Sequence, residues 1–273
     1  MSRITVIDDA DDPRVAAYVS LRERDLVGHA GHFIAEGEIV LRVLLGRSRF
    51  AVESAFILET RLPQLAPLIA QVPEPVPIYS AGRAIMDHVV GFPIHRGVLA
   101  VGQRGAEVTP GELLAGLGPR GLVVGLVGIA NHDNIGGIFR NAAAFGADAV
   151  LLDETSCDPL YRKAIRVSAG ASLCVPFARS RSADALLGEL AGAGCETLAL
   201  SPSGHETLRG MTWGARTALL FGTEKHGLPA GVLSRTRSVR VPMAPGFDSL
   251  NVATASGIAL YEAHLARLNP ASG

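Results

Sequence analysis

From residue 121 onward, short uninterrupted apolar runs alternate with longer mixed segments, and this pattern constrains the fold most. The runs at residues 122–129, 149–152 and 217–221 have strand length but no alternation of polar and apolar side chains. A strand that is apolar on both sides needs cover on both faces, as in a parallel sheet flanked by helices. We therefore predict an α/β fold with a doubly wound parallel sheet. Further strands are expected at residues 175–177, 197–200 and 239–241, and helices at residues 135–145, 162–172, 183–193 and 250–268.

The part before residue 106 predicts a smaller α/β domain. Helices are expected at residues 13–26, 37–45, 61–71 and 81–89, and strands at residues 50–58, 76–80 and 98–101. A stretch with several Gly and two Pro follows, as is typical of a linker, with one short helix expected at residues 112–117. The expected organisation is a small domain at residues 1–105, a linker at 106–119 and a larger domain at 120–273.

The composition indicates a soluble globular protein. Apolar residues make up 48% and charged residues 19% of the chain, and no uninterrupted apolar run approaches the roughly 20 residues that a membrane span needs. The first residues, MSRITVIDDADD, are polar and acidic, so we expect no secretory signal, no membrane contact and a cytoplasmic location. Cys157, Cys174 and Cys195 lack metal-ligand spacing, which favours reduced thiols and no metal. The net charge of −1 is not that of a strongly basic nucleic-acid-binding domain.

A first polar motif, Asn-His-Asp-Asn-Ile-Gly-Gly-Ile-Phe-Arg at residues 131–140, follows the apolar run at 122–129. Asn134 is predicted to cap the next helix through its side-chain oxygen. Gly136 and Gly137 allow a ligand to approach the start of that helix, where free N–H groups favour an anion. Arg140 lies four residues after Gly136 and is expected on the same face, where it can hold a phosphate.

Two more motifs follow later strands. Residues 222–227, Gly-Thr-Glu-Lys-His-Gly, come directly after the strand at 217–221, and Glu224 can accept a hydrogen bond from a ribose hydroxyl or orient Arg140. Residues 241–251 precede the last helix, which Ser249 is expected to cap, while Asn251 is expected to point into the same crevice. Because ligands of such sheets bind at the carboxyl ends of the strands, the three motifs predict one site. The phosphate-loop and dinucleotide-binding glycine patterns are missing after the predicted strands.

At these motifs the sequence resembles the SpoU (TrmH-like) family of RNA ribose 2′-O-methyltransferases, within the SPOUT superfamily. The resemblance covers residues 121–268 and has the three family motifs in order; residues 158–164 and 168–171 are also similar to the family. It implies a trefoil-knotted α/β domain, S-adenosylmethionine bound among the last loops, and an obligate homodimer with the closing helix in its interface. The residues that match or adjoin the cofactor-contacting positions of the family are Leu200, Ser201, Gly222, Val241, Met243 and Leu250.

The resemblance also implies the chemistry, in which a ribose 2′-hydroxyl attacks the methyl group of the cofactor. Arg140 matches the proposed base or base partner of the family, but arginine rarely deprotonates, so we expect it to act as an anchor and electrostatic stabiliser. The residues expected to orient the ribose and Arg140 are Asn134, Glu224, Ser249 and Asn251. Three cations on one predicted helix are expected to contact RNA near the crevice: Arg162, Lys163 and Arg166.

The part before the linker resembles the RNA substrate-binding domain that many family members carry, and residues 33–37, Phe-Ile-Ala-Glu-Gly, carry that resemblance. Its candidate phosphate contacts are Arg22, Arg24, Arg47 and Arg49. The RNA target stays open between tRNA and rRNA. Three alternatives remain: another nucleotide-binding α/β enzyme, a non-catalytic RNA-binding or ribosome-assembly factor that retains the knot, and a resistance-type methyltransferase specific for one ribosomal nucleotide.

Overall fold

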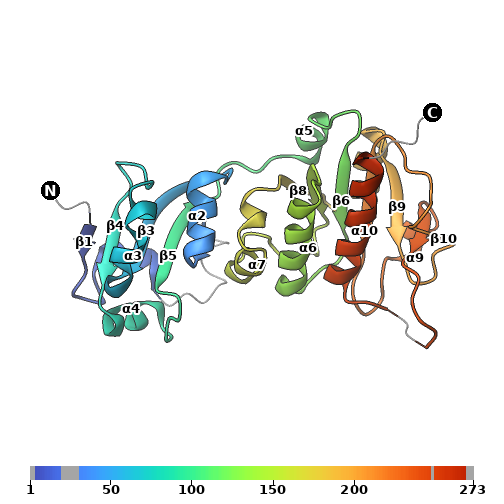
Figure 1. The fold of residues 1–273 in the computed structure, drawn as a ribbon. Coiled ribbons are helices and arrows are strands. Elements are labelled where there is room, and N and C mark those ends of the chain that lie inside the picture. Colours follow the sequence, from blue (N-terminus) through green and yellow to red (C-terminus); the bar gives the residue numbers. More distant parts are fainter. Residues whose placement is uncertain (1–3, 20–30, 247–248, 269–273) are drawn as a thin grey trace. The chain divides into compact units, whose positions relative to one another are not determined.

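The computed structural model describes residues 4–19, 31–246 and 249–268, and it divides the chain into two compact units. Unit 1 consists of Met1–Ala106 and Leu160–Cys174, and unit 2 of Glu107–Pro159 and Val175–Gly273 (Figure 1). The division near residue 106 lies within the stretch rich in Gly and Pro that separates the two predicted domains. The segment Leu160–Cys174, which we expected in the larger domain, instead packs in unit 1.

Unit 1 is built on a five-stranded mixed sheet in the order β1-β4-β3-β5-β2. Strand β5 pairs antiparallel with β2 and β3, whereas β4 pairs parallel with β1 and β3. The strands are β1 (Ile4–Val6), β2 (His32–Glu36), β3 (Ala51–Leu58), β4 (Ile78–Ala81) and β5 (Val98–Gln103). The helices are η1 (Pro13–Tyr18), α2 (Glu38–Gly46), η2 (Glu59–Arg61), α3 (Leu62–Ile69), α4 (Arg83–Val90), α7 (Arg162–Val167) and η3 (Ala171–Leu173).

The sequence predicted most of these elements to within a few residues, but it missed β1 and β2. The helix expected at residues 13–26 is wrong in its described part, because Pro13–Tyr18 forms a 3-10 helix and Val19 is extended; residues 20–26 lie outside the described residues. Tyr18 is fully buried there, and its hydroxyl lies 2.7 Å from the hydroxyl of Ser54. This short helix therefore anchors the chain through two fully buried side chains, Val15 and Tyr18.

Unit 2 contains a seven-stranded sheet in the order β10-β12-β9-β11-β6-β7-β8, in which every pairing is parallel. The strands are β6 (Leu122–Leu126), β7 (Ala149–Leu152), β8 (Phe177–Arg179), β9 (Glu196–Leu200), β10 (Glu206–Thr207), β11 (Thr217–Phe221) and β12 (Arg237–Arg240). The helices are α5 (Pro110–Ala115), α6 (His132–Ala144), α8 (Ala183–Gly192), α9 (Ala230–Leu233) and α10 (Val252–Leu268). The predicted parallel α/β sheet is thus confirmed.

Helices cover both faces of this sheet, which explains why its strands are apolar on both sides. One core cluster joins Leu114 of α5, Leu186 of α8 and Val232 of α9 to alternate strand residues such as Val123 and Leu220. Helices α6 and α10 lie side by side against the sheet (Figure 1). The described helices include none long and apolar enough to cross a membrane.

The stretch at residues 106–119, expected to be a linker, contains a structured part of unit 2. Thr109 and Glu112 form a capping box at the start of α5, with the Thr109 amide donating to the Glu112 carboxylate at 2.9 Å. Leu114 and Leu117 are buried in the core of unit 2. Pro110 and Gly111 lie in the first turn of α5 and Gly116 caps its end, so this stretch is not a free connection.

The strand order changes direction between β6 and β11, and this reversal brings the polar motifs together. From β6 the chain continues outward to β7 and β8, whereas β9, β12 and β10 lie on the other side of β11. The loops that follow β6 and β11 therefore leave neighbouring strands at the same edge, where doubly wound sheets bind their ligands. The trefoil knot that the resemblance implies stays a prediction.

Candidate active site

Three side chains from the three polar motifs form one hydrogen-bonded cluster. The Asn134 amide nitrogen donates to Glu224 Oε1 at 2.7 Å. The Asn251 amide nitrogen donates to the same Glu224 oxygen and to Asn134 Oδ1, at 2.9 Å each. Asn134 and Glu224 are 90 positions apart, and Asn251 lies 27 positions after Glu224. The convergence of the motifs, expected from the sheet topology alone, is therefore realised as direct contact.

Asn134 is the buried member of the cluster, with 5% of its surface exposed. It was predicted to cap α6, but the cap is Asn131, whose side chain accepts from the Asp133 amide at 2.8 Å. Helix α6 begins at His132, so Asn134 lies inside its first turn and its amide is free to reach the other motifs. The correction strengthens the functional interpretation, because a buried amide that does not cap a helix needs other partners.

The last helix, α10, is also capped by a different residue from the one predicted. Ser249, predicted to cap α10, is exposed, and it lines the neighbouring cavity. Asn251 caps instead, since its Oδ1 accepts from the amides of Ala253 at 2.9 Å and Thr254 at 3.2 Å. With the oxygen held by the helix, the Asn251 nitrogen faces Asn134 and Glu224. One side chain thus starts the helix and closes the cluster.

The loop that carries Glu224 is shaped by its two glycines. Thr223 and Gly227 exchange backbone hydrogen bonds at 3.1 and 2.9 Å, and Gly227 adopts a left-handed backbone with φ of 66°. A Cβ added to Gly222 would lie 2.3 Å from the Gly227 carbonyl carbon, so only glycine fits there. The closed loop presents Glu224 at the carboxyl end of β11.

Arg140 lies outside the cluster. It is exposed on α6, and its guanidinium makes no hydrogen bond or ion pair with the described parts of the chain. The face of α6 that carries Gly137 and Asn141 packs on α10, with Gly137 so close that a Cβ would lie 2.7 Å from the Ala253 Cβ. The Asn141 amide donates to the Ala253 carbonyl at 2.7 Å. The orientation of Arg140 by Glu224, expected from the sequence, is therefore absent, and the guanidinium faces solvent.

A cavity of about 430 Å³ adjoins the cluster in unit 2. Its wall includes the loops after β9, β11 and β12, together with the start of α10. All six residues proposed as cofactor contacts line it: Leu200, Ser201, Gly222, Val241, Met243 and Leu250. Glu224 and Ser249 line the same cavity.

A buried carboxylate that sequence reasoning missed supports the loop before α6. Asp153, 4% exposed, follows β7 and accepts hydrogen bonds from the Gly128 amide at 3.0 Å and the Ser156 amide at 2.9 Å. The hydroxyls of Ser156 and Thr155 donate to it at 2.6 Å each. Gly128 in turn lies against Thr223, because a Cβ there would be 2.7 Å from the Thr223 methyl. The only feature of the sequence that pointed to Asp153 was its position directly after the strand predicted at residues 149–152.

The cations proposed as RNA contacts lie in unit 1 and not in the unit that contains the cavity. Arg162 and Arg166, on α7, form ion pairs with the buried Glu36 of β2 at 3.1 and 3.4 Å. The Arg162 guanidinium also lies over the Phe92 ring at 4.8 Å from its centroid. Lys163 is half-buried on the same helix. Helix α7 belongs to unit 1 because its contacts with β2 include this buried carboxylate, which no helical periodicity could predict.

Arg47 and Arg49 also lie in unit 1, near Cys174, while Arg22 and Arg24 fall outside the described residues. Burial raises the pKa of the Cys174 thiol, and it raises the pKa of the Cys157 thiol to about 11. These thiols are therefore protonated at neutral pH. No group of three or more metal-binding side chains occurs among the residues that the structure describes.

Comparison with known proteins gives consistent results. Residues 121–261 match the model of the SpoU rRNA Methylase family. An uncharacterized tRNA/rRNA methyltransferase from Mycobacterium bovis is 40% identical over 265 residues, which cover 93% of this chain and 89% of that protein.

Solved structures share the fold. An AdoMet-bound rRNA methyltransferase from Sinorhizobium meliloti has a TM-score of 0.77 at 22% identity, covering 98% of this chain and all (100%) of that one. A structure described as an RNA 2′-O ribose methyltransferase has a TM-score of 0.78 at 23% identity, covering 97% and 100%. The family match spans all three polar motifs and the cluster that they form, and the chain belongs to the SpoU rRNA methylase family.

Proposed function

We propose that this protein transfers a methyl group from S-adenosylmethionine to a ribose 2′-hydroxyl of tRNA or rRNA. The observation that carries the proposal is the Asn134–Glu224–Asn251 cluster, whose Glu224 lines the 430 Å³ cavity. Family membership supports RNA methylation, and the M. bovis relative is described as acting on tRNA or rRNA. The ribose position is supported by the arrangement of the motifs and by the description of one structural neighbour.

The cavity suits S-adenosylmethionine. Its volume lies in the range of about 300–1,000 Å³ typical of small-molecule sites. Leu200, Leu228 and Val252 give an apolar wall, and Ser201 and Glu224 give polar groups. A carboxylate is a suitable neighbour for a sulfonium cation. When bound, the cofactor supplies an electrophilic methyl group.

The cluster supplies an acceptor for the ribose. A hydroxyl is a weak nucleophile until its proton is held or removed. Asn134 and Asn251 both donate to Glu224 Oε1, which fixes the carboxylate and directs Oε2 elsewhere. We assign Oε2 to accept from a ribose hydroxyl, with Ser249 beside it at the cavity wall. Because the two amides already orient the carboxylate, it loses little conformational freedom when RNA binds.

Arg140 is assigned to an RNA phosphate. It is exposed on α6 and has no partner in the described chain. A guanidinium holds phosphate through paired charge-assisted hydrogen bonds, and it stays protonated throughout the reaction. The proton of the 2′-hydroxyl therefore passes to another acceptor, which we assign to Glu224 Oε2, and the arginine stabilises the developing negative charge. Arg162, Lys163 and Arg166 are kept as proposed RNA contacts of unit 1, although Glu36 neutralises part of their charge.

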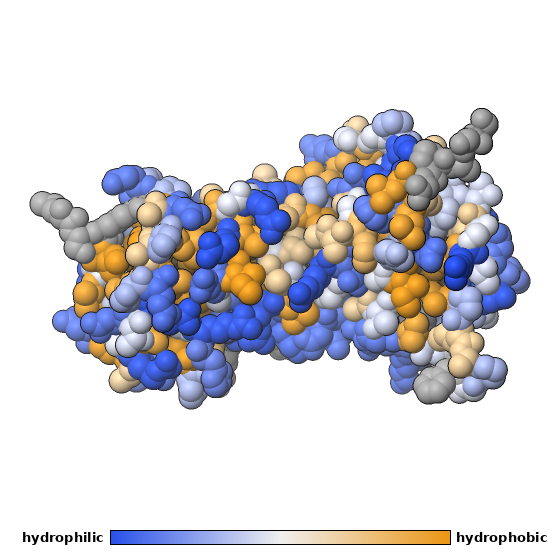
Figure 2. All heavy atoms as spheres, in the orientation of Figure 1, coloured by the Kyte–Doolittle hydropathy of each residue, from blue (hydrophilic) through white to orange (hydrophobic). Residues whose placement is uncertain are grey.

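A homodimer through α10 belongs to the same proposal. Three large apolar or aromatic side chains of this helix are exposed in the single chain: Ile258 by 37%, Tyr261 by 48% and Leu268 by 63%. Figure 2 shows hydrophobic residues at the surface of unit 2. Exposed apolar groups on one helix are typical of a protein interface. Sedimentation of the purified chain at micromolar concentration tests this; a monomer at all concentrations contradicts it.

The experiment for the reaction uses the purified protein, S-adenosylmethionine with a tritiated methyl group, and separate tRNA and rRNA fractions. Ribose methylation is expected to give labelled dinucleotides that resist alkaline hydrolysis. Label recovered only in mononucleotides would place the methyl group on a base and refute the ribose assignment. Mapping of 2′-O-methyl groups in a deletion strain and its parent then identifies the nucleotide. Absence of binding to S-adenosylmethionine in calorimetry would refute the reaction class.

A further inference from the structure

One wall of the cofactor cavity begins a crossover that has no helix. Strands β9 and β11 are parallel neighbours, so residues 201–216 return the chain from the carboxyl end of the sheet to its amino end. Such crossovers usually contain a helix, whose internal hydrogen bonds hold the segment together. Here the segment contains only the two-residue strand β10. Its conformation therefore depends on contacts with the sheet edge.

The near end of the crossover forms part of the cavity. Leu200, Ser201 and Ser203 line it. The Ser201 amide donates to the Val239 carbonyl at 3.0 Å, and the two serine hydroxyls lie 3.0 Å apart. We call residues 200–203 the rim.

Just beyond the rim, the crossover lies directly on β12. A Cβ added to Gly204 would lie 2.4 Å from the Val239 carbonyl carbon. Arg240 donates to the carbonyls of Gly204 and His205. The rim is thus continuous with a segment pressed against the backbone of β12.

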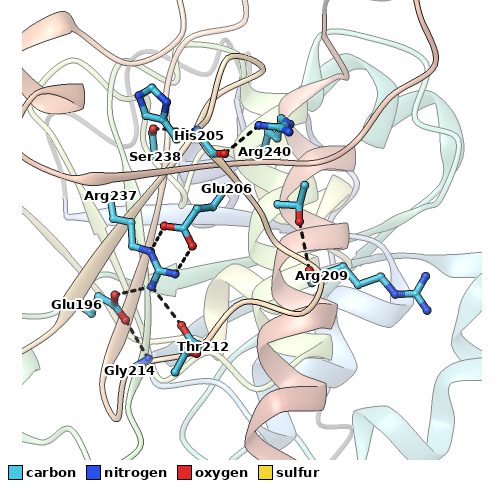
Figure 3. Close-up of polar contacts among 10 residues, drawn as sticks. Glu196, His205, Glu206, Arg209, Thr212, Gly214, Arg237, Ser238 and Arg240 are labelled. Carbon is cyan, nitrogen blue, oxygen red and sulfur yellow. Dashed lines mark hydrogen bonds and ion pairs between the residues drawn. The ribbon is translucent and has the colours of Figure 1, made fainter.

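The far part of the crossover is fastened by Arg237 (Figure 3). Its guanidinium donates side-on to Glu206, from Nε at 2.7 Å and from Nη2 at 2.5 Å. Its remaining nitrogen, Nη1, donates to Glu196 at 2.8 Å and to the Thr212 carbonyl at 3.2 Å. Glu196 also accepts from the Gly214 amide at 2.9 Å. One arginine on β12 therefore ties together β9, β10 and the loop that leads to β11.

This arrangement is stronger than an ordinary surface ion pair. The Arg237 side chain is 30% exposed, Glu196 33% and Glu206 47%. The side-on pair with Arg237 lowers the pKa of Glu206, and the two carboxylates raise the pKa of Arg237. Bidentate geometry within a network is the case in which partly exposed ion pairs stabilise structure.

We infer that Arg237 is a positioning residue for cofactor binding, which fastens the crossover and thereby holds the rim in its binding conformation. The inference rests on the proposed function, since it assigns the cavity to S-adenosylmethionine. Arg237 does not line the cavity, and its ion pair with Glu206 and its bond to the Thr212 carbonyl join it to the crossover that begins at the rim. Without Arg237 the rim keeps only its own contacts with β12, through the Ser201 amide and Arg240, and part of its ordering falls to the ligand. Ordering even one backbone residue on binding weakens affinity about tenfold.

The test uses the full-length chain with Arg237→Met, the conservative Arg237→Lys, and Arg235→Ala as the matched control. Arg235 pairs with Asp184 at 2.6 Å and is 51% exposed, but it touches neither the crossover nor the cavity. Calorimetry is expected to show an S-adenosylmethionine Kd about tenfold higher in Arg237→Met, partly restored in Arg237→Lys and unchanged in Arg235→Ala. The KM for S-adenosylmethionine should rise with Kd, while kcat at saturation stays within about twofold.

Limited trypsin digestion gives a second readout that does not depend on activity. Arg209 is exposed within the crossover, and cleavage after it should accelerate in Arg237→Met but not in Arg235→Ala. Equal Kd values for wild type and Arg237→Met overturn the inference, even if the variant melts at a lower temperature. If the wild-type chain itself binds no S-adenosylmethionine, the proposed function fails and the cofactor role of Arg237 fails with it, while digestion still reports whether Arg237 fastens the crossover.

Discussion

The bond between Asn134 and Glu224 gives the sharpest test of the site, through Asn134→Ala, Glu224→Ala and the double variant. Asn134 is 5% exposed, and its amide donates to the carboxylate at 2.7 Å. Loss of a hydrogen bond to a charged group costs about 1.5–3 kcal/mol. If that bond fixes the carboxylate for the ribose, Asn134→Ala lowers the rate about 10- to 150-fold. Glu224→Ala also removes the acceptor itself, so we expect a loss of about 100- to 1,000-fold.

The double variant separates a coupled cluster from two independent contributions. Once Glu224 is gone, Asn134 has no carboxylate to orient, so the double variant should be at most about threefold slower than Glu224→Ala. The assay is single-turnover methyl transfer at saturating S-adenosylmethionine. Asp133→Ala, one position before Asn134, is the control and should stay within about twofold of wild type, since the exposed Asp133 takes no part in the cluster. Losses that multiply, making the double variant about 10- to 150-fold slower than Glu224→Ala, would refute the reasoning.

Three further predictions concern Arg140, Asp153 and Cys157. Arg140→Ala should reduce kcat/KM for RNA about 10- to 100-fold without lowering Tm, because it loses a phosphate contact and a stabilising charge but no side-chain contact within the described chain; near-native methyl transfer by the dimeric variant would disprove its role. Asp153→Ala should lower the free energy of unfolding by about 3 kcal/mol or more, since it leaves several buried donors without an acceptor, and Asp153→Asn should cost less. Equal denaturation midpoints for Asp153→Ala and wild type would contradict this. Because burial raises the pKa of Cys157 to about 11, its contribution to stability is complete below the unfolded thiol pKa of about 8.5 and is lost as pH rises towards 11. Urea midpoints of wild type and Cys157→Ala should therefore converge between pH 8 and pH 10.5; a constant difference would contradict the assignment.

The parallel sheet of unit 2 was predictable from the sequence because burial on both faces requires uninterrupted apolar runs. The runs at residues 149–152 and 217–221 coincide with β7 and β11 to the residue. The edge of the sheet at which the candidate site lies was predicted as well, since parallel strands place their carboxyl ends at one edge. For the same reason, the three motifs were predicted together although 117 positions separate Asn134 from Asn251.

Local sequence could not assign the individual roles at that edge. Asn131 and Asn134 have the same side chain and both stand near the start of α6, but the helix begins at His132, so Asn131 caps it and Asn134 is left to bond Glu224. Likewise, Asn251 caps α10 and leaves Ser249 exposed. Capping depends on the residue at which the helix begins, and sequence patterns predict that boundary least well.

Contacts between distant segments were decided by the tertiary structure alone. Helix α7 was predicted from its residues, but its membership of unit 1 depends on the buried Glu36, 126 positions before Arg162. The same holds for Asp153, and for the fastening of residues 201–216 by Arg237. The periodicity of apolar residues indicates which face of a helix or strand is buried. It does not record which element lies against that face, because the energy of a polar contact depends on the partner that folding brings to it.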